Sequence, residues 1–192
     1  MNNSLHGMAV IDDAEFPPVE AADESGRAIA ERGSNSDLDA SLRFAQDHAA
    51  TLRYCPGVGW LFWDSQRWTT NADHAAVELS KRSARKWLLR CAKSENSDLK
   101  KGAVALESAA HIKNAVDLAR SDPRLAIKVS ELDVDPWKLN VQSGTLDLRT
   151  GTLHPHKRDD YITKLAPVIF EPNATHEALT RLLAHSRDPR RG

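Results

Sequence analysis

The spacing of apolar residues predicts two helices in the first half of the chain. Ser36 and Asp37 are residue types that favour a helix N-cap, and apolar residues at helical spacing follow them, which predicts a helix over 37–49. A longer helix is predicted over 73–93, because its apolar residues gather on one side at 100° per residue. That side consists of Val77, Ser80, Ala84, Trp87, Leu88 and Cys91.

The pattern beyond this helix is less regular. Residues 94–102, SENSDLKKG, predict a loop or a frayed helix end. Residues 103–120 predict a further helix that ends at Asp122-Pro123. Residues 175–185 predict a short helix. The buried stripe of the segment 103–120 is expected to consist of Ala105, Ala109, Ile112, Val116 and Ala119.

Two other regions show the pattern of β-strands separated by turns. The aromatic-rich segment 51–70 predicts an antiparallel meander with strands near 52–55, 60–64 and 67–70. The segment NVQSGTLDLRTG (140–151) predicts a hairpin, because its glycines permit turns and TLDL alternates as a strand does. On this strand Leu146 and Leu148 are expected to pack on one side. A further strand is expected within TKLAPVIFEP (163–172).

These elements together predict an α+β fold, in which a small antiparallel meander and hairpins pack with two to four helices. Residues 1–35 differ from the rest, because they are acidic, small and polar and include two prolines and three glycines. A segment of this kind buries too little apolar surface to offset its conformational entropy. The sequence therefore predicts a disordered acidic tail over 1–35.

Composition and charge limit the class of protein to which the chain can belong. Of the 192 residues, 41% are hydrophobic and 28% charged, and the formal net charge is −1. These values are typical of a soluble globular protein. Because the net charge is close to zero, any surface that binds nucleic acid would have to be a local cluster of basic residues. No leader and no run of about 18 apolar residues is visible, so a cytoplasmic protein without a membrane segment is expected. The two cysteines, Cys55 and Cys91, are too far apart for a C-x-x-C pair and predict reduced thiols.

Several catalytic motifs are missing from the chain. No glycine is followed by lysine, which excludes the phosphate-binding loop G-x-x-x-x-G-K-[ST]. The serine-hydrolase motif G-x-S-x-G is also absent. His176-Glu177 begins like the zinc motif H-E-x-x-H, but Thr180 occupies the position of the second histidine.

Two acidic segments are candidate metal ligands. Asp133 and Asp135 share one side of any strand that contains them, as in two-metal sites, but the proline that follows favours a solvated turn. The second segment combines two histidines with two carboxylates and is also common in surface loops. It consists of His154, His156, Asp159 and Asp160. No metal ion and no cofactor is predicted for this chain.

Two features are candidates for contact with nucleic acid. The aromatic residues Trp60, Phe62, Trp63 and Trp68 would suit base stacking, although packing in a core is favoured. The predicted helix 73–93 carries a basic side opposite its apolar side, which would suit phosphate groups or simply face water. The candidate nucleic-acid-binding residues are Lys81, Arg82, Arg85, Lys86 and Arg90, and Lys93 continues the same side.

The segment 133–172 carries a longer pattern, D-x-D-P-W-x-L-N-V-x-x-G-T-L-D-L-R-T-G followed by D-x-I-T-K-L-A-P-V. This pattern closely resembles phage and plasmid primase–helicases of the poxvirus-primase-like group, which carry a superfamily 3 helicase. The resemblance covers about residues 36–172. The matching positions are Asp133, Asp135, Pro136, Trp137, Leu139, Asn140, Val141, Gly144, Thr145, Leu146, Asp147, Leu148, Arg149, Thr150, Gly151, Asp160, Ile162, Thr163, Lys164, Leu165, Ala166, Pro167 and Val168.

The resemblance implies the domain that precedes the helicase ATPase. In the family the catalytic aspartates of the primase lie upstream, and Asp133 and Asp135 do not match them. The Walker motifs, which bind ATP and Mg²⁺, lie downstream, so the chain is expected to be truncated before the ATPase. The expected divisions are an acidic tail (1–35), the helicase-associated domain (36–172) and a short helix with a polar stub (173–192).

The function implied is that of an N-terminal domain of a replicative DNA primase/helicase of a phage or plasmid. Such a domain links primase to helicase and contacts single-stranded or forked DNA or sister subunits, without a catalytic centre of its own. One alternative is a standalone DNA-binding or interaction module that modulates a full-length helicase. Another is a decayed prophage remnant. Helicase activity cannot be carried over, because the residues that perform it are absent from the chain.

Overall fold

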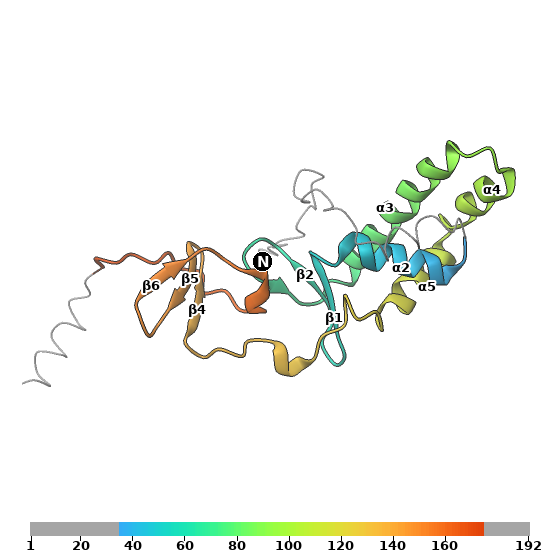
Figure 1. Cartoon of the computed structure of the whole chain (residues 1–192). Helices are drawn as coiled ribbons and strands as arrows, with labels where there is room; N and C mark the ends of the chain where they lie inside the picture. Colours follow the sequence, from blue (N-terminus) through green and yellow to red (C-terminus); the bar gives the residue numbers. More distant parts are fainter. Residues whose placement is uncertain (1–34, 175–192) are drawn as a thin grey trace, which may run out of the picture.

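The computed structural model describes residues 35–174, and the predicted α+β fold is confirmed (Figure 1). The helices gather at one end of the molecule, a first sheet lies in the middle, and a second sheet lies at the other end. The helices are α2 (Asp37–His48), α3 (Asp73–Ala92), α4 (Ser97–Ala105) and α5 (Ala109–Ala119). The strands are β1 (Leu52–Cys55), β2 (Gly59–Trp63), β3 (Trp68–Thr69), β4 (Lys138–Val141), β5 (Gly144–Asp147) and β6 (Thr152–His154).

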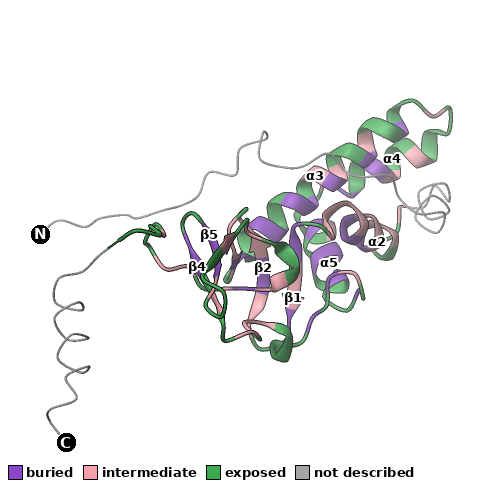
Figure 2. Cartoon of the chain, turned by 60° about the vertical axis from the view of Figure 1, so that its left-hand side comes forward, coloured by how far each residue is buried: buried purple, intermediate pink, exposed green. Residues whose placement is uncertain are grey.

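The main hydrophobic core lies where α2, α3 and α5 meet the first sheet, which is an antiparallel meander in the order β1-β2-β3. Phe44 of α2 meets Trp60 of β2 edge to face, with ring centroids 6.0 Å apart. Figure 2 shows the buried residues of the helices and of β1 and β2 turned toward this region. The core residues are Phe44, Ala45, Leu52, Trp60, Ala72, Ala75, Ala76, Leu79, Val116, Ala119 and Leu125.

Helix α3 forms where predicted, but its buried side is only partly the predicted one. Val77 is exposed, because α3 begins against β2 and buries its neighbours Ala75 and Ala76 there. Further along the helix, Trp87 and Cys91 are buried as expected. Burial raises the pKa of the Cys91 thiol, and that of Cys55 as well, which makes both thiols poor nucleophiles at neutral pH.

The region after α3 corrects two predictions. The segment 94–102 is not simply a loop, because α4 begins at Ser97, where the Asn96 side chain accepts hydrogen bonds from the amides of the first turn. The predicted helix 103–120 is divided after Ala105, and Ser108 caps a new helix, α5. Both Ala105 and Ala109 are exposed. The capping residues decided these boundaries, and the apolar spacing alone did not separate the two helices.

The segment 140–151 forms the predicted hairpin. Strands β4, β5 and β6 make an antiparallel sheet in sequence order, in which Asn140 pairs with Thr145. Gly144 has a φ of +150°, and a Cβ atom there would lie 2.3 Å from the carbonyl oxygen of His154, so a side chain has no room. Leu146 is buried, but Leu148 is exposed because β5 ends at Asp147 and the chain turns there. The expectation that both leucines pack together is wrong.

The strand expected over 163–172 is reduced to a single parallel bridge between Val141 and Ala166. The Ala166 amide donates to the carbonyl of Asn140, and the Gln142 amide donates to that of Val168. The Val168 amide, which would continue the ladder, donates instead to the carbonyl of Ala166, so the chain turns at Pro167 and the pairing ends. The predicted tail 1–35, apart from its last residue, and the predicted helix 175–185 lie outside the described residues.

Within residues 35–174, none of the helices combines the length and the apolar character that crossing a bilayer requires.

Candidate nucleic-acid interface

The basic side of α3 lines an open groove on the surface of the molecule, with a volume of about 700 Å³. Four of the five predicted nucleic-acid-binding residues border it, and the fifth, Arg90, is exposed at the end of α3 but not among the lining residues. The groove is lined by Glu78, Lys81, Arg82, Arg85, Lys86 and Leu89 of α3, by Glu107, and by Ile112 of α5.

The arrangement follows from helical geometry. Because α3 buries one side against α2, α5 and β2, its remaining residues fall in two rows on the outer surface at i, i+4 spacing. One row contains Lys81, Arg85 and Leu89, and the other contains Glu78, Arg82 and Lys86. Each row therefore places two cations one helical turn apart, and the groove runs along the rows.

Ion pairs on the surface engage Lys81, Arg85 and Lys86. Lys81 pairs with Glu78 one turn earlier, Arg85 Nε lies 3.0 Å from Glu107 Oε1, and Lys86 pairs with Asp47 of α2. The Lys81 and Arg85 side chains are 52% and 65% exposed. Ion pairs this exposed contribute about 1 kcal/mol or less. The cations can therefore exchange these carboxylates for another anion at little energetic cost.

Behind the groove, Asp47, His48 and Ser83 form a polar cluster between α2 and α3. The Ser83 hydroxyl lies 3.0 Å from His48 Nε2 and 3.1 Å from Asp47 Oδ2. A Ser-His-Asp triad needs the carboxylate on the imidazole, whereas here it bonds to the serine, and Ser83 is itself buried. The arrangement therefore differs from a catalytic triad, and its hydrogen bonds connect α2 to α3. The linear sequence contains no signal for this contact, because 35 residues separate His48 from Ser83.

Burial lowers the pKa of His48 from 6.5 to about 4, assisted by the positive charges of Lys86 and Arg82 and opposed by Asp47 and by a hydrogen bond to the Leu79 carbonyl. Between these two values the unfolded chain binds a proton that the folded chain does not. The free energy of unfolding is therefore expected to fall as the pH drops from about 6.5 to 4, by about 3 kcal/mol.

Urea unfolding at a series of pH values measures this slope. His48→Gln is the control, because it cannot titrate, and the difference between the two proteins isolates the contribution of His48. Equal slopes for the wild-type protein and the variant would contradict the prediction.

The candidate metal ligands have structural roles instead. The Asp133 carboxylate accepts hydrogen bonds from the amide and the hydroxyl of Thr163, at 2.8 and 2.6 Å. The Asp135 carboxylate accepts from the Trp137 amide, which is the turn that the sequence favoured. Between residues 35 and 174, no group of three or more His, Cys, Asp or Glu side chains is placed to hold a metal ion.

The second candidate metal segment is also divided among different partners. His156 Nδ1 lies 2.8 Å from Asn140 Oδ1, and Asp160 pairs with Lys138, while His154 is exposed. The H-E-x-x-H-like residues at 176–180 lie outside the described residues.

The aromatic residues of the meander pack in the hydrophobic core, which is the role that the sequence favoured. Trp60 and Trp68 are fully buried, and Phe62 and Trp63 are half-buried. Trp63 packs against Trp68 with ring centroids 5.7 Å apart. Stacking of nucleic-acid bases on the two buried tryptophans is therefore excluded in this conformation.

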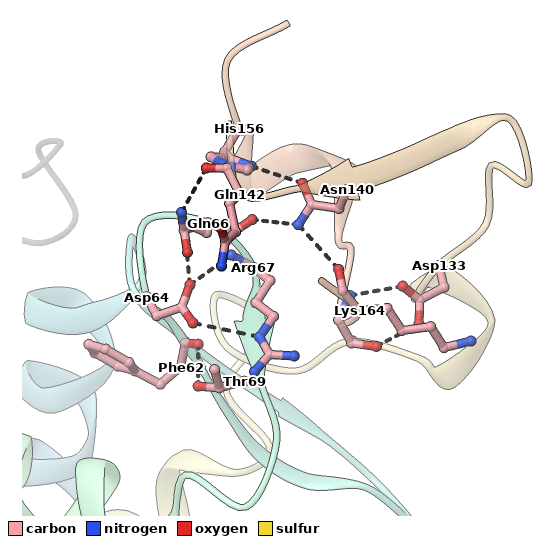
Figure 3. Close-up of polar contacts among 11 residues, drawn as sticks. Phe62, Asp64, Gln66, Arg67, Thr69, Asp133, Asn140, Gln142, His156 and Lys164 are labelled. Carbon is pink, nitrogen blue, oxygen red and sulfur yellow. Dashed lines mark hydrogen bonds and ion pairs between the residues drawn. The ribbon is translucent and has the colours of Figure 1, made fainter. Parts of the chain in front are cut away.

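Asn140 joins the second sheet to the first, and Figure 3 shows its contacts with Gln66, His156 and Lys164. Its Nδ2 donates to the carbonyls of Gln66, in the β2–β3 turn, and of Lys164. Its Oδ1 accepts from the Thr145 hydroxyl and lies near His156 Nδ1. The primase–helicase-like pattern includes Asn140, but the sequence alone does not reveal that a single side chain connects four segments.

A family model described as D5 N terminal like matches residues 41–185, roughly three-quarters of the chain. The chain belongs to this family. The match includes the whole basic side of α3 and the Asn140 contacts, and it confirms the resemblance to the domain of phage and plasmid primase–helicase proteins. No curated protein matches the chain. The chain is therefore an N-terminal domain of the primase–helicase type.

Proposed function

We propose that this D5 N-terminal-like domain binds DNA through the outer side of α3 while it connects primase and helicase modules, and that it has no catalytic centre. The observation that carries the DNA contact is the groove of about 700 Å³ bordered by Lys81, Arg82, Arg85 and Lys86. Membership of the primase–helicase family supplies the context in which such a surface would meet DNA.

The electrostatics of the groove support a phosphate ligand. Four cations and two carboxylates line it, so its local charge is positive although the chain as a whole carries a charge of −1. Phosphates that displace Glu78, Glu107 and Asp47 would form charge-assisted hydrogen bonds, bidentate in the case of arginine. Binding of this kind releases counterions and does not read base sequence.

The structural roles of the acidic residues support the absence of a catalytic centre. Both carboxylates of the D-x-D segment are engaged by backbone amides, and Ser83 is buried among α2 and α3. ATP hydrolysis would then belong to a partner module, with ATP and Mg²⁺ bound there.

The test is a titration with single-stranded and forked DNA. The triple variant Arg82→Gln, Arg85→Gln, Lys86→Gln is expected to bind about 10- to 100-fold more weakly. The slope of log K against log salt concentration is expected to fall by about 2, because each phosphate contact on a single strand contributes about 0.7.

The matched control removes the same charge from the region of the second sheet. Arg149→Gln, Lys157→Gln and Lys164→Gln alter three exposed residues that do not border the groove. Equal losses of affinity in the two triple variants would contradict a localised interface, and so would a wild-type chain that binds neither DNA.

The exposed apolar residues near the second sheet favour a second candidate, contact with sister subunits or with a full-length primase–helicase. Trp137, Leu139 and Leu148 are 46%, 41% and 47% exposed. Co-purification with an intact helicase that survives the α3 triple variant but is lost in Trp137→Ala would support this contact. Retention of the complex in both variants would argue against it.

A further inference from the structure

The groove beside α3 is lined by apolar as well as basic side chains, and a phosphate backbone would contact only the basic ones. Leu89, which is 62% exposed, contributes apolar surface among the basic side chains, and Ile112, which is only 9% exposed, also lines the groove. Charged phosphate groups gain nothing from an exposed leucine. A peptide that carries both carboxylates and apolar side chains can use the cations and the apolar surface of the groove together. The groove therefore fits an acidic peptide that also carries apolar side chains.

The chain itself contains such a peptide. The segment VIDDAEFPPVEAADES (10–25) has six carboxylates and no basic residue, and it places Phe16 and Val19 among them. Residues 1–34 carry seven acidic residues against two arginines, a net charge of −5, so the rest of the chain carries +4. The two parts of the chain therefore have opposite charge.

The point at which this segment joins the folded body lies beside the same helix. Trp87 Nε1 of α3 donates to Asn35 Oδ1 at 2.8 Å, and Asn35 Nδ2 donates to the carbonyl of Leu99 at 3.0 Å. A Cβ atom on Gly102 would lie 2.3 Å from Asn35 Nδ2, so Asn35 is closely held between α3 and α4. The acidic segment is thus tethered at α3.

The length of the connection allows the segment to reach the groove. About 10 residues separate Ser25 from Asn35, which spans up to about 35 Å when extended. The groove residues of α3, from Glu78 to Leu89, extend over about 17 Å of helix. A tether of this length holds its ligand at an effective concentration of about millimolar, so a weak interaction is sufficient for occupancy.

We propose that the acidic segment 10–25 docks into the α3 groove of its own chain, with its carboxylates on Lys81, Arg82, Arg85 and Lys86 and its apolar side chains on Leu89. The consequence for DNA rests on the proposed function: the segment occupies the phosphate-binding surface and lowers the affinity for DNA until a polyanion displaces it. The domain would then bind DNA only above a threshold set by its own tail.

Docking is measured without DNA, in the full chain, with a spin label attached at Ala14→Cys. The two native thiols are buried and react slowly. In NMR spectra the label is expected to broaden the amide resonances of residues 81–89 selectively. Broadening is expected to disappear when Asp12→Asn, Asp13→Asn and Glu15→Gln are added, and to weaken in about 0.5 M salt. Absence of selective broadening in the native tail would overturn the docking.

DNA affinity is measured in parallel with a matched control. The tail variant Asp12→Asn, Asp13→Asn, Glu15→Gln is expected to bind single-stranded DNA about three- to tenfold more tightly. The control Asp98→Asn, Asp159→Asn, Glu171→Gln removes the same charge from exposed positions and is expected to leave affinity nearly unchanged. Equal gains in the two variants would overturn the competition.

The two assays separate this inference from the proposed function. Selective broadening in a chain that binds no DNA would support the docking and overturn the DNA-binding proposal. DNA binding that depends on Arg82, Arg85 and Lys86, without broadening, would support DNA binding and overturn the docking.

Discussion

Replacement of Trp68 by alanine is expected to lower the free energy of unfolding by about 3–5 kcal/mol. Trp68 is fully buried and packs with Cys55, Leu61 and Ile127. Its ring stacks on Tyr161 with centroids 5.9 Å apart, and its Nε1 donates to the Arg158 carbonyl at 2.8 Å. The substitution would open a cavity and leave that carbonyl without its partner, at a place where the first sheet meets the segment after β6.

Urea unfolding followed by circular dichroism measures this loss. Trp68→Phe keeps most of the buried ring but not the Nε1 donor, so a smaller loss of about 1–2 kcal/mol is expected. Trp137→Ala is the matched control, because the same substitution at a tryptophan that is 46% exposed should cost less than about 1 kcal/mol. Similar losses for Trp68→Ala and Trp137→Ala would show that Trp68 does not hold the two regions together.

The second large effect is expected at Asn140, where leucine should destabilise the protein by about 3 kcal/mol. Leucine approximates the size of asparagine but cannot donate to the Gln66 and Lys164 carbonyls or accept from Thr145. Buried groups that lose a hydrogen-bond partner each cost about 1–3 kcal/mol. Because Asn140 is only 4% exposed, water cannot replace these bonds without local opening.

Hydrogen exchange locates this effect. In Asn140→Leu the amides of β4, β5 and β6 are expected to lose protection before those of α2 and α5, because the second sheet depends on Asn140 for its attachment. Asn114→Leu is the control, since Asn114 is exposed and donates to Asp37 on the surface. Uniform loss of protection in both sheets would contradict a local role for Asn140.

The local sequence pattern was sufficient to predict those elements whose structure depends on residues adjacent in the chain. The helices 37–49 and 73–93 and the hairpin 140–151 follow from apolar periodicity and from turn residues, which act over a few residues. It did not predict that Val77 and Leu148 are exposed, because their exposure depends on which other elements pack nearby. It also failed to divide α4 from α5, where Asn96 and Ser108 act as caps within a continuous apolar pattern.

The candidate interface shows the same division. The basic side of α3 could be predicted, because i, i+4 spacing alone places Lys81 beside Arg85 and Arg82 beside Lys86. That Glu107 and Ile112 complete the groove could not be predicted, since the turn between α4 and α5 brings them there. The partners of the carboxylates in the D-x-D segment also come from distant positions, such as Thr163.

The sequence by itself determined the amphipathic helices, the turns of the hairpin, the opposite charges of the tail and the rest of the chain, and the family to which the chain belongs. Only the tertiary structure decided how Asn140 connects the two sheets, how His48 is buried against Ser83, and which residues line the groove. The physical reason is that periodicity and turn chemistry are properties of adjacent residues. Burial and hydrogen-bond partners arise when segments 30 to 100 residues apart come into contact.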